Sequence, residues 1–510
     1  MAVLIASRAM ELATLVAGSD PCEIIGDPHA EITGLACHTR LAEPGTLFFC
    51  VPGTVHDGHD FAGDAVAAGV TALVVERPLG LSVTQVVVGS VRRAMALAAA
   101  TFYERPSTHL KIAGVTGTNG KTTTAHVMAS VFEAAGLQCA LLGTVVNRIN
   151  RVDQSVTLTT PDSIELQRLL REMVDAGDRA CAMEASSHAL MMDRTVGIAF
   201  DAVVFTNLTR DHLDFHGDLE AYYRAKRRLF LPAEERHPAA VAVVNVGDAW
   251  GRRLAEECAE AYGDDLHTYA VVGDDAGNAD FLALDQHVEV DRSAFTLDDR
   301  RRGRKLSIAT HLGGHFNVAN ATAAAATGLA LGLETEAVVE GLSSVSGVPG
   351  RFEAVRAGQP FGVLVDYAHT PDSLENALMA ARSLGEGRLL VVFGCGGDRD
   401  RGKRPQMGAA AAQLADVAYV TSDNPRSEDP EAIIADILTG IPDDRREMVV
   451  VESDRRRAIG AALAAARAGD VVVIAGKGHE TGQLVGSERL PFDDREVADE
   501  VLRDLRRRGS

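Results

Sequence analysis

The stretch Lys111-Ile-Ala-Gly-Val-Thr-Gly-Thr-Asn-Gly-Lys-Thr-Thr-Thr124 is the part of this sequence on which the fold depends. Its apolar residues Ile112–Val115 predict the end of a buried strand, and the segment from Thr123 to about Gly136 has apolar residues at helical spacing. Glycines lie between the two elements, with Lys121 and Thr122 directly after them. This layout is typical of a phosphate-binding loop, because glycines let backbone N–H groups surround phosphate oxygens and the helix N-terminus adds positive partial charge.

The loop departs from the strict pattern for such sites at one position. The pattern would place its first glycine at 115, where this chain has Val115. Lys121 can still reach the outer phosphates, and the Thr122 hydroxyl can ligate Mg²⁺. The alternative is a tight turn before a helix, which Gly-Lys-Thr directly after a strand makes the weaker interpretation.

The composition is that of an ordinary globular protein. The chain has 510 residues, of which 46% are hydrophobic and 24% charged, and this length suits about three domains. A formal net charge of −21 disfavours a nucleic-acid partner. The basic cluster Arg300–Lys305 is therefore interpreted as a solvated loop.

Cysteine usage and hydropathy indicate the compartment. The seven cysteines are scattered without a Cys-x-x-Cys pair, which favours reduced thiols over a disulfide framework or a zinc site. Arg8 and Glu11 interrupt the apolar N-terminus, and no apolar run is long enough to span a membrane. We therefore expect a cytoplasmic protein without a signal peptide or membrane insertion.

The order of apolar runs predicts an α/β protein of three domains, at residues 1–105, 106–348 and 349–510. In the first, an N-terminal α/β domain, strands are expected at Thr46–Val51 and Val70–Val75 with a helix at Ala62–Ala68. Arg105-Pro106-Ser107 is the expected linker to the second domain.

The other two domains repeat the alternation of strand and helix. In the central domain, strand signals at Cys139–Leu142, Ala180–Glu184 and Ala202–Thr206 predict a doubly wound parallel sheet with helices on both faces. The section Ala240–Ala309 is richer in strand patterns and turns. The C-terminal domain is expected to be Rossmann-like, with strands at Gly362–Asp366, Leu389–Phe393, Val417–Ser422 and Val471–Ala475. Ligands of such open sheets bind at the carboxyl ends of the strands.

Polar residues follow two strands of the central domain. Glu184 stands at the end of one, in Met183-Glu-Ala-Ser-Ser-His188, where an acid beside a phosphate loop usually contacts Mg²⁺. The alternative for Glu184 is a solvated loop acid. His212 follows the next strand and is either a metal ligand or a polar group at a helix start, and by itself the second is favoured.

Seven motifs along the chain share a resemblance to one family. They are Gly117-Thr-Asn-Gly-Lys-Thr-Thr123, Glu184-Ala-Ser-Ser-His188, Asn207-Leu-Thr-Arg-Asp-His-Leu-Asp214, Gly314-His-Phe-Asn-Val-Ala-Asn320, Gly350-Arg351, Asp366-Tyr-Ala-His369 and Gly394-Cys-Gly-Gly-Asp-Arg399. Together they resemble the Mur ligase family, the ATP-dependent amide ligases of peptidoglycan precursor synthesis, over nearly the whole chain. The resemblance implies a UDP-sugar domain, an ATP-binding domain and an amino-acid domain.

The resemblance also implies the chemistry and its residues. ATP would convert the D-glutamate γ-carboxylate of UDP-N-acetylmuramoyl-L-alanyl-D-glutamate to an acyl phosphate, which an amine then attacks. The implied catalytic residues are Lys121, Glu184, His212, Lys226 and Arg351, and two Mg²⁺ ions would be held by Thr122, Glu184, His212 and a carbamylated Lys226. Without the resemblance, Lys226 in Tyr223-Arg-Ala-Lys226 is one cation among several on an exposed helix.

Further residues are assigned to ATP by resemblance. They are Gly117, Thr118, Asn119, Gly120, Lys121, Thr122, Thr123, Asn317, Asn320, Arg351, Asp366 and His369. Asn317 and Asn320 lie on one face of a helix start, and their alternative role is helix capping. The alternative for Arg351 is an interdomain salt bridge.

The UDP-sugar peptide is implied to contact Thr39, Thr159, Thr160, Ser186, Met192 and Arg194. The default for Thr160 is helix capping. The chain departs from the family here: His38-Thr39-Arg40 replaces Asp-Ser-Arg, and Met192 replaces a glutamine. Thr481-Gly482-Gln483 also lacks a tyrosine often found after Gly-His-Glu.

The implied amino-acid residues are Arg399, Asp423, Asn424, Pro425, Arg426, Gly476 and Glu480. The motifs Asp423-Asn-Pro-Arg426 and Gly476-Lys-Gly-His-Glu480 resemble the members that add meso-2,6-diaminopimelate, whose distal carboxylate suits an arginine fork. By spacing alone, Arg426 could equally pair with Glu428 or Asp429.

Alternatives remain at this point. They are an L-lysine-adding ligase of the same family and a folylpolyglutamate synthase, which would lack the N-terminal domain and Asp-Asn-Pro-Arg. A nucleotide switch would need an Asn-Lys-x-Asp motif, and the sequence has none. The expected partners are small-molecule substrates, with no nucleic acid and a monomeric state.

Overall fold

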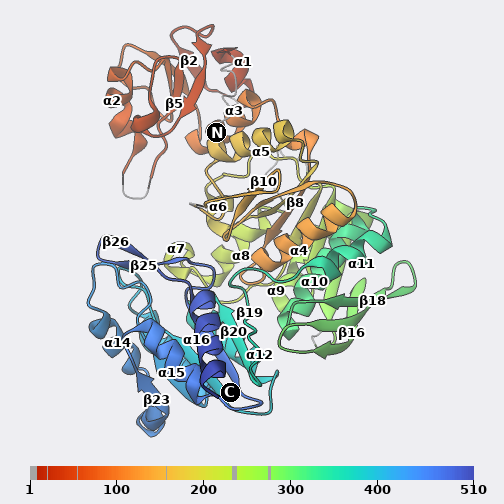
Figure 1. The fold of residues 1–510 in the computed structure, drawn as a ribbon. Helices are drawn as coiled ribbons and strands as arrows, with labels where there is room; N and C mark the ends of the chain where they lie inside the picture. The colour runs from red at the N-terminus through yellow and green to blue at the C-terminus, as the bar shows by residue number, and fades with distance from the viewer. Residues whose placement is uncertain are drawn as a thin grey trace. The chain divides into compact units, whose positions relative to one another are not determined.

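The computed structural model describes residues 9–19, 21–53, 56–156, 158–231, 238–273 and 277–509. They divide into two compact units. The first holds Met1–Thr116, Leu137–Val203 and Tyr223–Val241, and the second holds Gly117–Gly136, Val204–Tyr222 and Ala242–Ser510. Both consist of sheets covered by helices, which confirms the α/β class (Figure 1).

The first unit begins with a five-stranded sheet in the order β2-β7-β6-β5-β4. Strands β4 to β7 run parallel, and β2 is antiparallel to β7. Phe49 and Val74 face α1 and α3, while Phe48 and Leu73 face α2, so both faces of the sheet are covered. The elements of this part are β1 (Met10–Glu11), α1 (Leu12–Val16), η1 (Ala17–Ser19), β2 (Glu23–Ile25), β3 (Glu31–Ile32), β4 (Gly34–Ala36), η2 (Thr39–Leu41), β5 (Thr46–Phe49), η3 (Gly58–Phe61), α2 (Ala62–Ala67), β6 (Ala72–Val75), β7 (Thr84–Val87) and α3 (Val91–Phe102).

The expected linker at Arg105–Ser107 lies between α3 and β8 and is not an open connection. Pro106 occupies the first turn of a short helix, η4 (Pro106–His109), which suits its fixed backbone angle. Ser107 is buried, and its Oγ accepts a hydrogen bond of 3.1 Å from the N–H of Ala199. The segment is therefore packed against the fold and does not form an open connection.

The first unit also contains the strand that leads to the phosphate loop. Its strands lie in the order β11-β10-β9-β12-β8, and the helix α5 packs on them. The register pairs Glu184 with Val115, so the end of β12 lies beside the end of β8. The elements are β8 (Lys111–Thr116), β9 (Cys139–Leu142), β10 (Asn147–Ile149), β11 (Val152–Gln154), α5 (Ser163–Ala176), β12 (Ala180–Glu184) and α6 (Ser187–Met191).

The strands predicted for the central sheet are parallel, and a hairpin that was not predicted extends the sheet. Strands β8, β9 and β12 are parallel, but β10 and β11 form an antiparallel hairpin. Its two turn residues, Asn150 and Arg151, have φ values of 48° and 62°. Positive φ at both positions is typical of the type I′ turn, whose twist matches that of a hairpin.

The second unit contains the phosphate-loop helix and a mixed sheet. Strands β14, β15 and β16 are parallel, and β16, β17 and β18 form an antiparallel meander. Arg301 and Arg304, in and beside the β17–β18 turn, pair with Asp280 and Asp299, as suits a solvated turn. The elements are α4 (Lys121–Ala134), α7 (Leu213–His216), β14 (Val241–Asn245), α9 (Ala249–Tyr262), η5 (Gly263–Asp265), β15 (Leu266–Val271), β16 (Phe281–Val288), β17 (Ser293–Asp299), β18 (Arg304–Thr310), α10 (His315–Ala330) and α11 (Thr335–Ser344), while β13 (Ala202–Phe205) and α8 (Leu219–Arg227) cross from one unit to the other along the chain.

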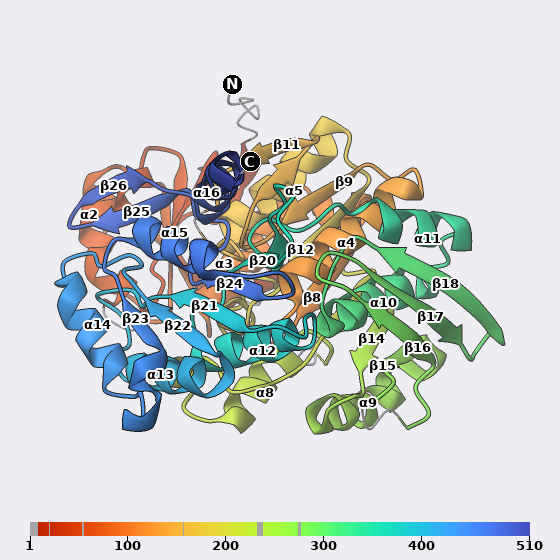
Figure 2. The ribbon, with the colours of Figure 1, turned by 60° about the horizontal axis from the view of Figure 1, so that its bottom comes forward.

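The C-terminal part of the second unit is a doubly wound sheet in the order β19-β20-β24-β21-β22-β23. Strands β20 to β24 are parallel, with α12, α13 and α14 packed on one face and α15 and α16 on the other (Figure 2). All four predicted strands are present, two residues shorter in the case of β22. The elements are β19 (Glu353–Ala354), β20 (Gly362–Asp366), α12 (Pro371–Arg382), β21 (Leu389–Phe393), α13 (Lys403–Leu414), β22 (Val417–Val420), α14 (Pro430–Leu438), η6 (Asp443–Met448), β23 (Val449–Val451), α15 (Arg455–Ala465), β24 (Val471–Ala475), β25 (Gly482–Val485), β26 (Glu488–Pro491) and α16 (Asp494–Gly509).

Among the described residues, no helix is both long enough and apolar enough to cross a membrane.

Candidate active site

The phosphate loop connects β8 to α4 and can contain only glycine at two positions. Gly117 and Gly120 have φ values of 150° and 84°. A Cβ at Gly117 would overlap the hydroxyl of Thr206, and one at Gly120 would overlap the side-chain oxygen of Asn320. Gly120 is also the N-cap of α4 and provides no side-chain acceptor, so the helix start is suited to an external anion.

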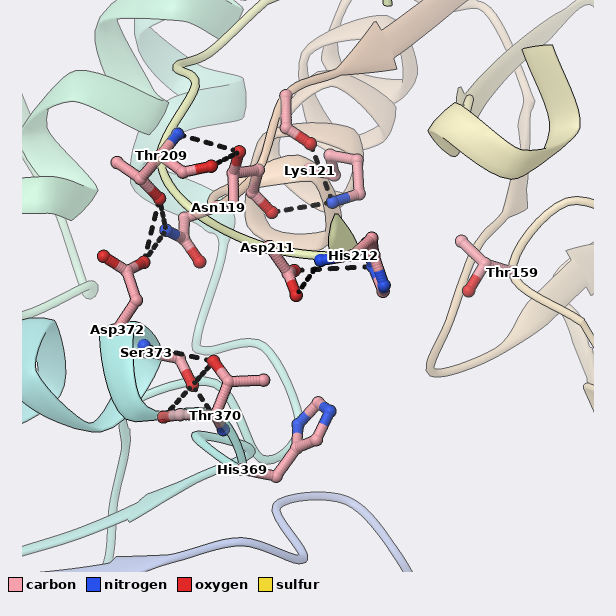
Figure 3. Close-up of polar contacts among 12 residues, drawn as sticks. Asn119, Lys121, Thr159, Thr209, Asp211, His212, His369, Thr370, Asp372 and Ser373 are labelled. Atoms are coloured by element: carbon pink, nitrogen blue, oxygen red, sulfur yellow. Dashed lines mark hydrogen bonds and ion pairs between the residues drawn. The ribbon is translucent and has the colours of Figure 1, made fainter. Parts of the chain in front are cut away.

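Lys121 is the first residue of α4 and lies over its own loop. Its Nζ donates to the carbonyl oxygens of Gly117 and Thr118, at 3.0 and 2.8 Å (Figure 3). These neutral acceptors hold the ammonium at the loop mouth. Thr122 and Thr123 follow in the same turn and are buried.

The loop is held against the segment after β13 by neutral hydrogen bonds. The Thr118 hydroxyl accepts from the N–H of Thr209 at 3.0 Å, and the N–H of Asn119 donates to the side chain of Asn207 at 2.9 Å. The Thr206 hydroxyl donates to the carbonyl oxygen of Asn119 at 2.6 Å. The sequence therefore placed the two motifs together correctly at this end of the sheet.

One carboxylate of α12 also reaches the phosphate loop. Asp372 Oδ2 accepts from Asn119 Nδ2 at 3.3 Å and from Thr209 Oγ1 at 2.8 Å (Figure 3). It also accepts from Asn376 Nδ2 at 3.2 Å. The sequence analysis missed Asp372, although its place after the Asp-Tyr-Ala-His motif at a helix start was a signal.

His212 lies at the N-terminus of α7 with a φ of 52°. Its side chain is 46% exposed, and Nε2 lies 3.4 Å from Asp211 Oδ2. The backbone N–H of His212 also donates to Asp211 Oδ1, at 2.8 Å.

Asn317 and Asn320 are buried in the first turns of α10. Asn317 Nδ2 donates to the carbonyl oxygen of Gly313 at 2.7 Å, and Asn320 Nδ2 donates to Asn317 Oδ1 at 3.0 Å. Asn320 Oδ1 accepts from Thr124 of α4 at 3.3 Å. The helix-capping alternative is wrong, because the N-cap is Gly314 and no side chain caps it.

Arg351 lies over the ring of Tyr367, with its guanidinium carbon 4.7 Å from the ring centre. Its Nε is buried and has no hydrogen-bond partner among the described residues. An orphaned, buried donor of this kind fits a phosphate oxygen of a bound nucleotide.

Asp366 fixes the loop that carries Arg351. Its two oxygens accept from the N–H groups of Phe352 and Ala368, at 2.7 and 2.8 Å. Burial raises the pKa of the Asp366 carboxyl, and the Arg351 guanidinium opposes this effect. His369 lies on the loop after β20, with Nδ1 2.9 Å from the carbonyl oxygen of Tyr367.

In the first unit, Glu184 is buried at the end of β12. Its Oε1 accepts from the N–H of Thr144 at 2.7 Å, and Oε2 accepts from the Thr144 hydroxyl at 3.1 Å. The solvated-acid alternative is therefore wrong, since only 1% of Glu184 is exposed. Thr144, which the sequence analysis missed, also lies 3.1 Å from the hydroxyl of Thr159.

Thr160 connects Glu184 to the other predicted UDP-sugar residues. Its hydroxyl donates to the carbonyl oxygen of Glu184 at 2.8 Å and accepts from the N–H of Ser186 at 3.2 Å. Arg194 donates to the carbonyl oxygen of Thr160 at 2.9 Å and to the sulfur of Met192 at 3.4 Å. Burial lowers the pKa of Arg194. The capping default for Thr160 is wrong, because Asp162 is the N-cap of α5.

The loop that carries Thr39 lies beside this group. Ligand atoms of Cys37, His38 and Asp162 all lie within 4.8 Å of one another. Burial, followed by the Asp162 charge, raises the pKa of the Cys37 thiol to about 12. The charges of Asp162 and Arg92 both act on this region.

Lys226 of α8 is 1% exposed. The alternative of a cation on an exposed helix is therefore wrong for this residue, although the neighbouring Arg224 is exposed. A buried lysine amine must be partnered or chemically changed, since an isolated buried charge is costly.

The amino-acid motifs meet at the carboxyl ends of β22 and β24. Lys477 Nζ donates to Asn424 Oδ1 at 3.0 Å and to Glu480 Oε2 at 2.9 Å. Asn424 Nδ2 also donates to Glu480 Oε2, at 2.8 Å. Burial would raise the pKa of Glu480, but Lys477 and Asn424 outweigh it and hold that pKa below its usual range. Asp423 lies so close to Gly476 that a Cβ at Gly476 would approach its carboxylate to 2.6 Å.

Arg426 does not pair with Glu428. Its Nη1 donates to the carbonyl oxygen of Gly397 at 2.8 Å, whereas Glu428 binds Arg404 and Arg401. The alternative of an Arg426–Glu428 pair is therefore wrong. Arg399 is exposed on the facing loop, and Pro425 is buried.

The chemical groups of these residues fit a nucleotide and its metal. Glycines that admit no side chain, a helix start without a capping side chain and the orphaned Nε of Arg351 suit phosphates. The Thr122 hydroxyl and the buried Glu184 carboxylate are oxygen ligands, which Mg²⁺ prefers.

Comparison with known proteins identifies the family. Three family descriptions match in order: Mur ligase family, catalytic domain, at residues 31–104; Mur ligase middle domain at 115–328; and Mur ligase, glutamate ligase domain, at 350–478.

The chain is 46% identical over 480 residues to UDP-N-acetylmuramoyl-L-alanyl-D-glutamate–2,6-diaminopimelate ligase of Solibacter usitatus, covering 93% of this chain and 94% of that protein. It is 46% identical over 493 residues to the protein of the same name from Gloeobacter violaceus, covering 94% and 96%. A solved structure with that name is 34% identical, with a TM-score of 0.70 over 98% of this chain and 100% of the other. With similarity of this extent along nearly its full length, the chain belongs to the Mur ligase family.

Proposed function

We propose that this protein is the ATP-dependent ligase that joins meso-2,6-diaminopimelate to the D-glutamate γ-carboxylate of UDP-N-acetylmuramoyl-L-alanyl-D-glutamate. The observation that carries the proposal is the near-full-length similarity to relatives whose name states this reaction. The product is a precursor of peptidoglycan, used in cell-wall growth and division. We further propose three domains, at residues 1–105, 106–348 and 349–510, and a monomeric, cytoplasmic protein.

The reaction requires that a poor acylating agent be activated. The γ-carboxylate attacks the terminal phosphorus of ATP, the bond from that phosphorus to its bridging oxygen breaks, and ADP leaves. An acyl phosphate results. The amine of the amino acid then attacks its carbonyl carbon, and inorganic phosphate leaves with the former carboxylate oxygen. Because two anions meet in the first step, cationic groups are needed around them.

We assign the nucleotide side to residues of the second unit. Lys121 would exchange its two carbonyl acceptors for phosphate oxygens, and Arg351 would turn its orphaned Nε toward them. Asn317 and Asn320 would contact the adenine, and His369 and Asp366 would line the same side. Two Mg²⁺ ions would be held by Thr122, Glu184, His212 and Lys226, and would neutralise phosphate charge.

The burial of Lys226 supports its carbamylation. A carbamate would convert the buried ammonium to an anion that a cation can balance. Native mass spectrometry should find the mass of one carbon dioxide on wild-type enzyme and not on Lys226→Ala, which should be nearly inactive. An unmodified lysine in fully active enzyme would contradict the assignment.

The UDP-sugar peptide would lie along Thr39, Thr159, Thr160, Ser186, Met192 and Arg194. The hydrogen bonds from Thr160 to Glu184 and from Arg194 to Thr160 support this, because they join the sugar side to the metal side within one unit. The sulfur of Met192 is a weaker acceptor than the amide of a glutamine.

The preference for meso-diaminopimelate over L-lysine depends on its distal carboxylate. We assign this group to Arg426, supported by Arg399, with Asp423, Asn424, Pro425, Gly476 and Glu480 around it. Lysine would leave the guanidinium of Arg426 without its partner, so discrimination should reach about 10²-fold or more in kcat/KM.

An amino-acid panel tests the function. Wild-type enzyme with ATP and the UDP-muramoyl-dipeptide should release ADP with meso-diaminopimelate and far more slowly with L-lysine. Arg426→Ala should reduce the difference in rate between meso-diaminopimelate and L-lysine, because it loses the use of diaminopimelate. Arg456 is an exposed arginine of α15 that pairs with Glu500, and Arg456→Ala should leave the difference unchanged. Equal use of lysine by wild-type enzyme would favour the lysine-adding alternative.

A further inference from the structure

Two loops carry the arginines assigned to the amino acid, and they touch through their backbones. One loop, residues 394–399, follows β21, and the other, residues 423–427, follows β22. The N–H of Gly397 donates to the carbonyl oxygen of Asn424 at 2.9 Å. A Cβ at Gly397 would overlap the carbonyl oxygen of Pro425. The position of each arginine therefore depends on the other loop.

A buried ion pair lies behind both loops. Arg404, in the first turn of α13, has a side chain that is 1% exposed. Its two terminal nitrogens donate to Glu428 Oε1 and Oε2 at 2.8 and 3.0 Å, in a bidentate pair. Asp436 of α14 accepts from the same guanidinium at 2.9 Å. The hydrogen bonds from Arg404 lower the pKa of Glu428 to about 2, so this pair stays ionised at neutral pH.

The pair binds the two loops directly. Arg404 Nη2 also donates to the carbonyl oxygen of Gly396, at 3.3 Å. Glu428 Oε1 accepts from the N–H of Asp398 at 2.6 Å. Glu428 follows Arg426 by two residues, so Arg404 holds the first loop by its backbone and the second through Glu428.

Both loops contain a strained residue that this contact must maintain. Asp398 and Arg426 have φ values of 51° and 53°, in the left-handed region that residues other than glycine rarely adopt. Ser427 donates from its N–H and its hydroxyl to Asp398, at 3.1 and 2.7 Å. Such conformations persist only where surrounding contacts determine them.

We propose that Arg404 and Glu428 are positioning residues for amino-acid selection, which hold Arg399 and Arg426 at the separation that meso-diaminopimelate requires. The proposal rests on the proposed function. Neither residue needs to touch the substrate, since each acts through the backbone of a loop that does. A planar bidentate fork fixes orientation as well as distance, which a lysine in place of Arg404 could not do.

The test uses Arg404→Lys and Glu428→Gln in the full-length enzyme. Each should raise the KM for meso-diaminopimelate by about tenfold and reduce the preference over L-lysine, with the KM for ATP within about twofold of wild type. The matched control is Arg388→Lys. Arg388 also binds a buried acid, Asp470, through two nitrogens that donate to the same oxygen, and this pair lies at the amino-terminal ends of β21 and β24, away from the loops. The control should lower the melting temperature similarly and leave the KM for meso-diaminopimelate unchanged.

A double mutant separates positioning from general stability. If Arg404 acts through Arg426, Arg404→Lys should raise the KM much less in an Arg426→Ala background than in wild type. An unchanged KM in both single variants, an equal rise in the Arg388→Lys control, or full additivity in the double mutant would overturn the proposal. If wild-type enzyme does not use meso-diaminopimelate at all, the proposed function fails instead, and the panel identifies this outcome separately.

Discussion

The phosphate loop and the amino-acid loops both lie at the carboxyl ends of parallel strands, but they are held in different ways. The phosphate loop is held mainly by neutral groups, namely the hydroxyls of Thr118 and Thr206 and the side chain of Asn207. Its left-handed positions are glycines. The amino-acid loops of residues 394–399 and 423–427 are held by the charges of Arg404, Glu428 and Lys477, and their left-handed residues, Asp398 and Arg426, are not glycines.

This difference follows from the two ligands. Phosphate brings several negative oxygens, so the loop that receives it must offer N–H groups and a cation that is not already paired with a carboxylate. Lys121 supplies the cation, and its Nζ donates to the neutral carbonyl oxygens of Gly117 and Thr118. A diamino dicarboxylic acid is a zwitterion, so its site needs both signs of charge at fixed separations. Opposite charges can then be paired within the protein before the ligand arrives.

The largest effect is expected at Lys121. Lys121→Ala should reduce kcat for ADP release by about 10³-fold, because the cation acts on charge that develops in phosphoryl transfer. The fold should persist, since the side chain bonds to carbonyl oxygens of its own loop and lies at the loop mouth. Circular dichroism and the melting temperature check the fold, and single-turnover ADP release checks the chemistry. Near-normal ligation by folded Lys121→Ala enzyme would mean that the phosphate loop does not depend on the Lys121 cation.

The second prediction concerns the close contact between the amino-acid loops. Gly397→Ala would force the carbonyl oxygen of Pro425 away from residue 397 and separate the two loops. We expect the KM for meso-diaminopimelate to rise by about 10²-fold, with the KM for ATP nearly unchanged. Initial rates over a range of each substrate measure both constants.

Two further glycines serve as controls for this prediction. Gly460 lies in α15, and a Cβ added there would meet no atom within 4 Å. Gly460→Ala should therefore leave both KM values unchanged and raise stability slightly. Gly120→Ala should show the reverse pattern: the KM for ATP should rise, and the KM for meso-diaminopimelate should not change. If Gly397→Ala raised the KM values for meso-diaminopimelate and ATP equally, the amino-acid loops and the phosphate loop would not be independent.

The sequence predicted those parts of the fold that depend on local pattern. Strands such as Cys139–Leu142 and Leu389–Phe393 have the predicted bounds, because a short apolar run between polar ends is buried on both sides of a parallel sheet. The phosphate loop and the motif after β13 were predicted to meet because the ends of parallel strands share one edge of the sheet. The α/β class and the Mur ligase family were predicted correctly.

The remainder depends on contacts between distant residues. Arg404 lies in Lys403-Arg404-Pro405, a polar helix start that indicates exposure, yet it is fully buried because two acids from another segment surround it. Their spacing in sequence would allow Arg426 and Glu428 to pair, but in the structure Glu428 forms its ion pair with Arg404. The same holds for Lys226, whose neighbours in sequence are charged and whose neighbours in space are not visible from the sequence.

The smallest effect is expected at Asp372, where a charge does reach the phosphate loop. Its Oδ2 accepts from Asn119, Thr209 and Asn376, and an asparagine could keep one such acceptor but would lose the charge that strengthens all three bonds. Asp372→Asn should therefore raise the KM for ATP by about twofold to threefold and leave the KM for the amino acid unchanged. It also removes an acid from the first turn of α12, at a cost of about 0.5 kcal/mol in the free energy of unfolding. Glu375→Gln, an exposed acid of the same helix, is the matched control and should leave the ATP constant unchanged. If the two variants behave alike, then the contact of Asp372 with Asn119 and Thr209 contributes nothing to nucleotide binding, and the phosphate loop is held by neutral groups alone.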